Sequence, residues 1–128
     1  MAAQGLTLDT GALLAAERRD RRFTKRIAVA LARGARITLP AVVLAQAWRG
    51  NSPILALLIR SCVVEPYDEP RARRAGELLA KSRTADVVDA TVALGAVLRG
   101  DTILTSDRED LARLVAAAGA PDTLIMAV

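Results

Sequence analysis

The sequence contains no histidine and only one cysteine, and both shortages limit the chemistry available to the chain. Without histidine there is no Ser-His-Asp or Cys-His catalysis, no histidine-ligated zinc and no imidazole general base. A single cysteine excludes an intrachain disulfide and a cysteine-rich zinc site. Cys62 lies in an apolar run, which is typical of a small buried hydrophobic residue rather than a nucleophile. Any hydrolytic chemistry must therefore use carboxylates, with an oxygen-binding metal such as Mg²⁺ or Mn²⁺.

Aromatic residues are also few, and long apolar runs are missing. Phe23, Trp48 and Tyr67 are the only aromatic residues, too few for a base-stacking nucleic-acid platform. No apolar run reaches the roughly 18 residues that a membrane span needs. The first residues lack the basic segment followed by an apolar one that marks a signal peptide. We therefore expect a cytoplasmic protein.

Length and charge predict one small domain with an uneven charge distribution. The 128 residues are 52% hydrophobic and 25% charged, which excludes a disordered or fibrous chain and predicts a single domain over residues 1–128. The formal net charge is +4, and the positive charge is concentrated in the first half of the chain. One dense basic run is either a solvated helix surface or a surface that binds an RNA backbone, and it comprises Arg18, Arg19, Arg21, Arg22, Lys25 and Arg26.

Short β-like runs alternate with helical stretches along the chain. The sequence predicts strands at residues 6–8, 36–39, 62–65, 102–105 and 124–128. It predicts helices at residues 11–20, 23–33, 41–49, 53–59, 68–83, 85–99 and 108–118. Strands separated by helices favour an α/β fold with three α/β/α layers, in which helices cover both faces of a parallel sheet of four to five strands. In such sheets, functional sites form beyond the carboxyl ends of the strands.

Acidic residues occur just after two predicted strands and at the start of one predicted helix. Asp9 follows the first strand directly, and Asp107 follows the fourth strand after one residue. Asp86 and Asp89 are three residues apart, a spacing that places both carboxylates on one face of a helix. Converging carboxylates repel one another, and a bridging metal ion removes that cost while it activates water and polarises a phosphate.

Each acidic residue also has an explanation that involves no metal. Asp86 and Asp89 are favourable at a helix N-terminus, because the helix dipole is positive there. Ser106 and Glu109 have the spacing of a capping box, and Asp9 suits a turn or a helix cap. Three acidic positions at strand ends and helix starts, in a chain without other catalytic groups, nevertheless favour a metal site. Three other acidic residues fit none of these positions and are expected to be solvated surface residues, namely Glu17, Glu77 and Asp101.

Four segments carry a resemblance to a known family. They are LDTGAL at residues 8–13, LPAVVLAQ at residues 39–46, DVVDATVA at residues 86–93 and LTSDREDL at residues 104–111. In this order and at these intervals they resemble the PIN domain, and specifically the VapC-like toxins of bacterial toxin–antitoxin pairs. The resemblance covers nearly the whole chain, from residue 6 to about residue 128.

The resemblance implies a three-layer α/β/α fold. It also implies a ribonuclease that depends on Mg²⁺ (or Mn²⁺) and cleaves structured RNA. It also implies inhibition by a cognate antitoxin protein and assembly into a homodimer. Position by position, the family's acidic metal ligands correspond to Asp9, Asp89 and Asp107, with Asp86 beside Asp89. Small hydroxyl residues beside the family's site correspond to Thr10 and Ser106.

One position departs from the family pattern. Gln46 stands where the family commonly has a glutamate, on the helix after the second strand. Its amide oxygen can bind a metal or hold water, but the side chain carries no charge and cannot act as a base. Two hypotheses from different classes therefore stay open: a metal-dependent endoribonuclease, and a catalytically weak module that binds RNA and an antitoxin. The variant Gln46→Glu distinguishes them by whether it raises the cleavage rate.

For the nuclease, the hypothesis is in-line attack of a metal-activated water on the phosphodiester, which leaves 5′-phosphate and 3′-hydroxyl ends. Asp86 would be a further ligand, directly or through water, while Gln46 and Ser106 would orient water or ligands. A signal-receiver or nucleotide-binding α/β domain is a third alternative. It is disfavoured because the chain has no glycine-rich phosphate loop, and because its only lysines, Lys25 and Lys81, do not follow the fifth strand.

Overall fold

The computed structural model describes residues 4–128, and at its centre lies a five-stranded sheet. The strands are β1 (Leu6–Leu8), β2 (Ile37–Pro40), β3 (Val63–Glu65), β4 (Thr102–Thr105) and β5 (Ile125–Ala127), in the spatial order β3-β2-β1-β4-β5. All four strand pairings are parallel. The predicted α/β fold with a parallel sheet is therefore confirmed.

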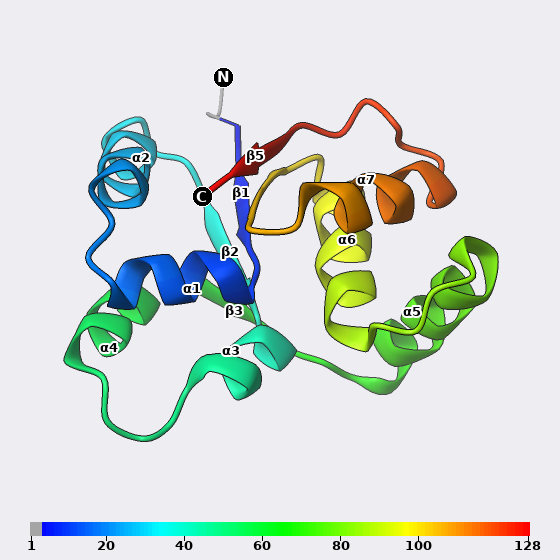
Figure 1. The fold of residues 1–128 in the computed structure, drawn as a ribbon, viewed down its shortest axis with the longest axis horizontal. Coiled ribbons are helices and arrows are strands. Elements are labelled where there is room, and N and C mark those ends of the chain that lie inside the picture. The colour runs from blue at the N-terminus through cyan, green and yellow to red at the C-terminus, as the bar shows by residue number, and fades with distance from the viewer. Residues whose placement is uncertain (1–3) are drawn as a thin grey trace.

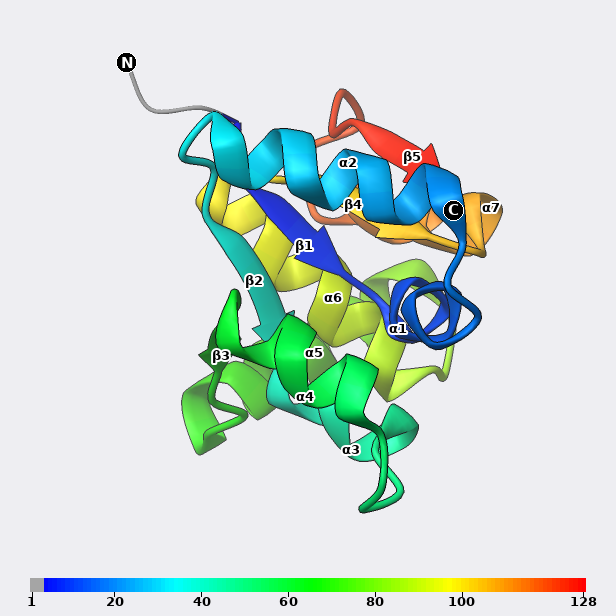
Figure 2. The ribbon, with the colours of Figure 1, turned by 90° about the vertical axis from the view of Figure 1, so that its left-hand side faces the viewer.

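The helices form two layers on opposite faces of this sheet. Within the described residues they are α1 (Thr10–Glu17), α2 (Arg21–Ala32), α3 (Ala41–Ala47), α4 (Pro53–Arg60), α5 (Glu69–Ser82), α6 (Val87–Arg99) and α7 (Arg108–Ala117). With the sheet seen nearly along its edge, α1, α2 and α4 lie on one side and α5, α6 and α7 on the other (Figure 1). Turning the molecule shows α2 in front of β1 and α6 behind it (Figure 2). None of the helices described from residue 4 onward is long and apolar enough to cross a membrane.

The core forms where both helical layers cover the sheet. Leu8, Leu39, Ile103 and Leu104 are fully buried, as expected for central strands of a parallel sheet. Helix α6 is buried over residues 90–96, and its small side chains allow close packing against the strands. Cys62 is half-buried, and burial raises the pKa of its thiol to about 11, which suits the predicted inert, hydrophobic role.

Several predicted boundaries need correction. Pro40 ends β2 and precedes α3, because its extended backbone (ψ 136°) still belongs to the strand. Helix α3 ends at Ala47, two residues before the predicted end, because Trp48 is already extended (ψ 131°). Ser106 is not the N-cap of α7: that position is Asp107, so the expected capping box is wrong. These differences lie at element ends, where boundaries shift most readily by one or two residues.

The expectation that Asp101 is a solvated surface residue is also wrong, because its exposed fraction is only 7%. Its carboxylate accepts a hydrogen bond from Thr7 at 2.8 Å and pairs with the Arg99 guanidinium at 2.9 Å. Arg99 also donates to Thr7 at 2.9 Å and pairs with Glu65, which in turn pairs with Arg71 at 2.8 Å. This ionic network ties α5 and α6 to β1 and β3.

Candidate metal centre

The site lies at the carboxyl edge of the sheet, where β1 and β4 are neighbours. Leu8 at the end of β1 pairs with Leu104 of β4, and the Asp9 N–H donates to the Leu104 carbonyl at 3.2 Å. Strands β2 and β3 lie on one side of β1 in the sheet, and strands β4 and β5, which follow later in the chain, lie on its other side. Such a switch point leaves a crevice beyond the strand ends, where parallel sheets bind their ligands.

Asp9 is buried at this edge, with an exposed fraction of 5%. It is the N-cap of α1: one carboxylate oxygen accepts the Ala12 N–H at 2.9 Å, and the other accepts the Thr105 hydroxyl. Burial raises the pKa of Asp9, and these hydrogen bonds oppose the rise. The predicted capping role therefore holds. Lone pairs remain on both oxygens, so capping does not preclude metal ligation.

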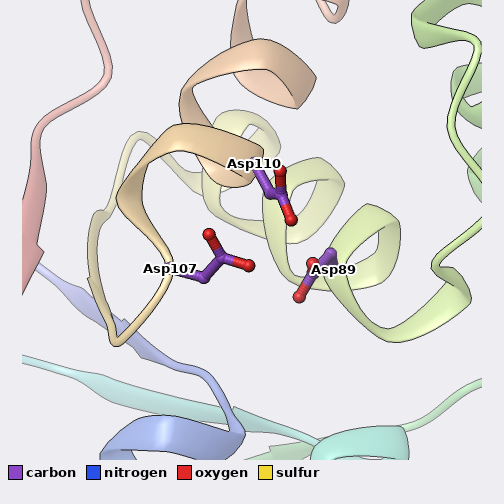
Figure 3. Close-up of side chains that lie close together, drawn as sticks. All are labelled: Asp89, Asp107 and Asp110. Atoms are coloured by element: carbon purple, nitrogen blue, oxygen red, sulfur yellow. The ribbon is translucent and has the colours of Figure 1, made fainter.

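Three other carboxylates converge where α6 and α7 begin. One oxygen from each of Asp89, Asp107 and Asp110 lies within 4.8 Å of the other two. Asp89 comes from the first turn of α6, Asp107 from the N-cap of α7 and Asp110 from the first turn of α7. Figure 3 shows the three side chains pointing into a common space between the two helices. Asp89 is half-buried and the other two are exposed. We call these three residues the acidic cluster.

Mutual repulsion and burial alter the protonation of the acidic cluster. Burial raises the pKa of Asp89 to about 7, assisted by the negative charges of Asp86, Asp107, Asp9 and Asp110. The adjacent Asp107 carboxylate also raises the pKa of Asp110. Near neutral pH the metal-free cluster therefore holds a proton that isolated aspartates would have lost. A divalent cation would supply the missing positive charge.

The donor set fits a hard divalent cation. Every donor is a carboxylate oxygen, the ligand type that Mg²⁺ and Mn²⁺ prefer. Although Asp107 occupies the N-cap of α7, its side chain makes no capping hydrogen bond, so this carboxylate is not engaged by the N–H groups of the helix. The structure therefore brings predicted ligands Asp89 and Asp107 together, adds Asp110, and places Asp9 close enough to affect Asp89.

Asp110 was not among the predicted ligands, although its signal is present in the sequence. It follows Asp107 by three residues, the same spacing that singled out Asp86 and Asp89. Asp86, which was among the predicted site residues, lies outside the acidic cluster. It is the exposed N-cap of α6 and accepts the Asp89 N–H at 2.9 Å. Its charge still contributes to the raised pKa of Asp89.

Two contacts join the remaining predicted residues to the site. The Thr10 hydroxyl donates to the Gln46 amide oxygen, which links α1 to α3 and leaves the amide NH₂ available. Ser106 packs against Gly11, where a methyl group in place of the glycine hydrogen would overlap the serine Oγ and lie 2.6 Å from its Cβ. Only glycine allows this approach between α1 and the loop that carries Asp107.

The structure divides the predicted RNA-binding run into two groups. Arg18, Arg19 and Arg21 are exposed where α1 ends and α2 begins. The other three, Arg22, Lys25 and Arg26, line a groove between α2 and the sheet. Arg26 is half-buried there and donates to the Ala127 carbonyl at 2.6 Å.

Comparisons with known proteins agree with this architecture. The family model described as PIN domain matches residues 6–116. The structure of VapBC2 from Rickettsia felis, bound to a DNA fragment from their promoter, superimposes with a TM-score of 0.71 at 14% identity, covering 96% of this chain and 98% of that chain. FitAcB from Neisseria gonorrhoeae gives a TM-score of 0.59 at 18% identity, with coverages of 94% and 96%. No curated protein sequence matches the chain.

Proposed function

The chain belongs to the PIN domain family, and from this premise we propose that it is a metal-dependent endoribonuclease, the VapC-like toxin of a toxin–antitoxin pair. The observation that carries the proposal is the acidic cluster at the switch point of the sheet, where three carboxylates lie within 4.8 Å of one another. A site of oxygen ligands, in a chain without histidine, suits phosphodiester hydrolysis by a bound cation better than any other hydrolytic chemistry.

Mg²⁺ or Mn²⁺ would be held by Asp89, Asp107 and Asp110, with Asp9 as a fourth carboxylate on the sheet side. When bound, the cation supplies positive charge that acidifies water and stabilises the developing charge on the phosphate. Thr105 holds the Asp9 carboxylate in one orientation through its hydroxyl. Thr10 fixes the amide of Gln46, whose NH₂ can then donate to water or to a phosphate oxygen.

The proposed substrate is RNA, bound through its phosphates. Arg18, Arg19 and Arg21 support this part of the proposal, because they are exposed and form no ion pair among residues 4–128. The likeness to VapBC2 and FitAcB supports a cognate antitoxin as inhibitor. A homodimer and a cytoplasmic location, where cellular RNA is available, complete the proposal.

The test is cleavage of total cellular RNA by purified, antitoxin-free protein with Mg²⁺, with Mn²⁺ or with EDTA. The variant Asp107→Asn removes one cluster carboxylate, and Glu109→Gln is its matched control, an exposed acid in the same turn of α7 outside the cluster. We expect discrete, metal-dependent fragments. Asp107→Asn should slow cleavage by at least about 10–100-fold, the range found for groups that only support metal ligands. Cleavage that persists in EDTA, or equal rates in the two variants, would refute the proposal.

The catalytically weak RNA- and antitoxin-binding module remains the second candidate. It is favoured by one observation: Gln46 is neutral, and its amide oxygen already accepts the Thr10 hydroxyl. Gln46→Glu restores the missing carboxylate without altering side-chain length. If the wild type is inactive and Gln46→Glu cleaves RNA with Mg²⁺, the natural protein is the binding module. If Gln46→Glu changes the rate of an active wild type by less than about threefold, the amide suffices for catalysis.

A further inference from the structure

Helix α7 carries a positive charge in line with two carboxylates of the acidic cluster. Asp107, Asp110 and Arg113 follow one another at intervals of three residues, so each is the neighbour of the next along α7. Figure 3 shows Asp107 and Asp110 near Asp89 of α6. Side chains on a helix lean toward its N-terminus, so the long side chain of Arg113 is directed toward the turn that carries Asp110.

The protonation of Asp110 supports this placement of Arg113. The Asp107 carboxylate raises the pKa of Asp110, and the positive charge of Arg113 opposes that rise. Arg113 is nevertheless exposed and forms no ion pair with a carboxylate among residues 4–128. The guanidinium group is therefore close to the acidic cluster and available to another anion.

The charge of the site creates a need for such a cation. Five carboxylates act on one another here, namely those of Asp9, Asp86, Asp89, Asp107 and Asp110. One divalent cation offsets two of these charges, so the fully ionised site stays negative when it is loaded. RNA carries a negative charge at every phosphate, and the uncompensated carboxylates repel the phosphates on either side of the bound one. A positive side chain beside the acidic cluster offsets this repulsion.

We propose that Arg113 binds the phosphate next to the scissile one and so positions the RNA strand across the metal centre. This inference rests on the proposed nuclease function and adds a substrate contact that the carboxylates cannot make. The neighbouring phosphate takes no part in bond breaking, so its contact is equally strong in the bound substrate and in the transition state. Arg113 therefore lowers KM and leaves kcat nearly unchanged. A guanidinium suits this role, because two of its N–H groups match two oxygens of one phosphate.

A purely local role for Arg113 fits the structure less well. If the side chain served only to neutralise Asp110, the spacing of three residues would allow an ion pair on the helix surface. The two side chains form no such pair. The charge of Arg113 is thus held near the acidic cluster without being used up by it.

The same helix offers a matched control for the loss of charge. Arg108 is also exposed and forms no ion pair among the residues described from 4 onward. It lines a hollow beside β5 together with Glu109, Ala112 and Ile125, away from the cluster carboxylates. Arg108→Gln therefore removes the same charge from α7 without touching the proposed phosphate contact.

The test measures cleavage of a defined oligoribonucleotide that the wild type cuts once with Mg²⁺. Arg113→Gln should raise KM at least about tenfold, through loss of a charge-assisted hydrogen bond, and change kcat less than about threefold. Arg113→Lys should recover part of the loss, because it keeps the charge without the planar fork. Arg108→Gln should keep KM within about twofold of the wild type. The slope of log KM against log salt concentration should fall by about 0.7–0.9 in Arg113→Gln, the share of one phosphate contact.

A second set of substrates identifies the phosphate. Each carries a single uncharged methylphosphonate, on either the 5′ or the 3′ side of the scissile bond. We expect one of them to raise KM for the wild type and to have little further effect in Arg113→Gln, because both changes remove the same contact. Additive effects would overturn the proposal, as would equal KM values for Arg113→Gln and Arg108→Gln.

The Mg²⁺-induced rise in melting temperature separates a substrate contact from support of the metal site. Arg113→Gln should keep this rise undiminished, because the variant removes a positive charge from beside the cation. A smaller rise than in the wild type would assign Arg113 to the metal site and overturn the proposal.

RNA binding distinguishes failure of this inference from failure of the proposed function. Fluorescence anisotropy in the Asp107→Asn background measures binding where cleavage is slow, and adding Arg113→Gln should weaken it about tenfold. A wild type that cleaves RNA, with no change of KM in Arg113→Gln, would overturn this inference alone. A wild type that neither binds nor cleaves RNA would overturn the proposed function and this inference together.

Discussion

Thr105 links two carboxylate-bearing segments at the carboxyl edge of the sheet. Its hydroxyl donates to the buried Asp9 carboxylate, and the same oxygen accepts the Asp107 N–H at 2.8 Å. Thr105 is itself fully buried. One side chain of β4 therefore sets both the orientation of the acid that follows β1 and the start of the loop that carries the acidic cluster.

Thr105→Val should destabilise the protein and weaken metal binding together. The valine has the same shape but leaves Asp9 with one donor fewer and the Asp107 N–H without its acceptor. We expect a loss of about 1–3 kcal/mol in the free energy of unfolding by urea. Thr123→Val is the control, because Thr123 bonds only to the Ala120 carbonyl, away from the site. A Thr105→Val protein as stable as the control would contradict this account.

Protonation of Asp89 predicts how stability changes with pH. Its pKa rises from 3.8 to about 7 on folding, so between these values the folded protein holds a proton that the unfolded chain has lost. The free energy of unfolding of the metal-free protein should therefore fall as pH rises from about 4 to about 7. Thermal melts in EDTA across this range measure the slope, which Asp89→Asn should reduce.

The same proton competes with a bound cation. At pH values above the raised pKa of Asp89, millimolar Mg²⁺ should raise the melting temperature. At pH values well below that pKa it should have little effect, because only the ionised cluster binds the cation strongly. The apparent Mg²⁺ affinity, measured by titration calorimetry, should drop as pH falls through about 7. An equal melting shift at both ends of the range would argue against a carboxylate cation site.

Gly11→Ala should disturb the site through packing. The added methyl group would overlap Ser106 Oγ and lie 3.0 Å from the Ser106 backbone nitrogen, so the loop that leads to Asp107 must move. We expect a loss of about 1–3 kcal/mol in unfolding free energy, together with weaker metal binding. Gly76→Ala is the matched control, since its methyl group meets nothing within 4 Å. That variant should gain up to about 1 kcal/mol, the helix preference of alanine over glycine.

Arg99→Met should cost much more stability than loss of a surface ion pair. The arginine side chain is 22% exposed and pairs with Asp101 and Glu65, whose side chains are 8% and 15% exposed. Removing it leaves buried carboxylates with fewer partners, and we expect a loss of about 3–5 kcal/mol in urea unfolding. Arg73→Ala breaks the exposed pair with Glu69 and should cost less than about 1 kcal/mol. Similar losses in the two variants would show that the network is not stabilising.

The ends of the RNA fragments test the mechanism directly. Attack by water activated at the acidic cluster leaves 5′-phosphate and 3′-hydroxyl ends. Ligation of fragments that requires a 5′-phosphate, followed by sequencing, detects them. A 2′,3′-cyclic phosphate would instead show that the ribose hydroxyl is the nucleophile, and would exclude the proposed role of the cluster.

Local sequence was sufficient for the fold class and for two members of the acidic cluster. Alternating strands and helices predicted the parallel sheet, because each element has its own apolar period and its own end signals. The rule that sites lie beyond strand ends singled out Asp107, and helix spacing singled out Asp89. Both lie in the acidic cluster.

The tertiary structure decided what local patterns cannot encode, namely which distant residues meet. Asp110 joins the cluster and Asp86 stays outside it, because the packing of α7 beside α6 sets the direction of each carboxylate. Asp101 is buried because Arg99 and Thr7 approach it from other elements. The sequence by itself determined the elements, the position of the acids at their ends and the absence of histidine. Strand order and helix packing determined the site, because they bring together side chains that lie up to about a hundred residues apart along the chain.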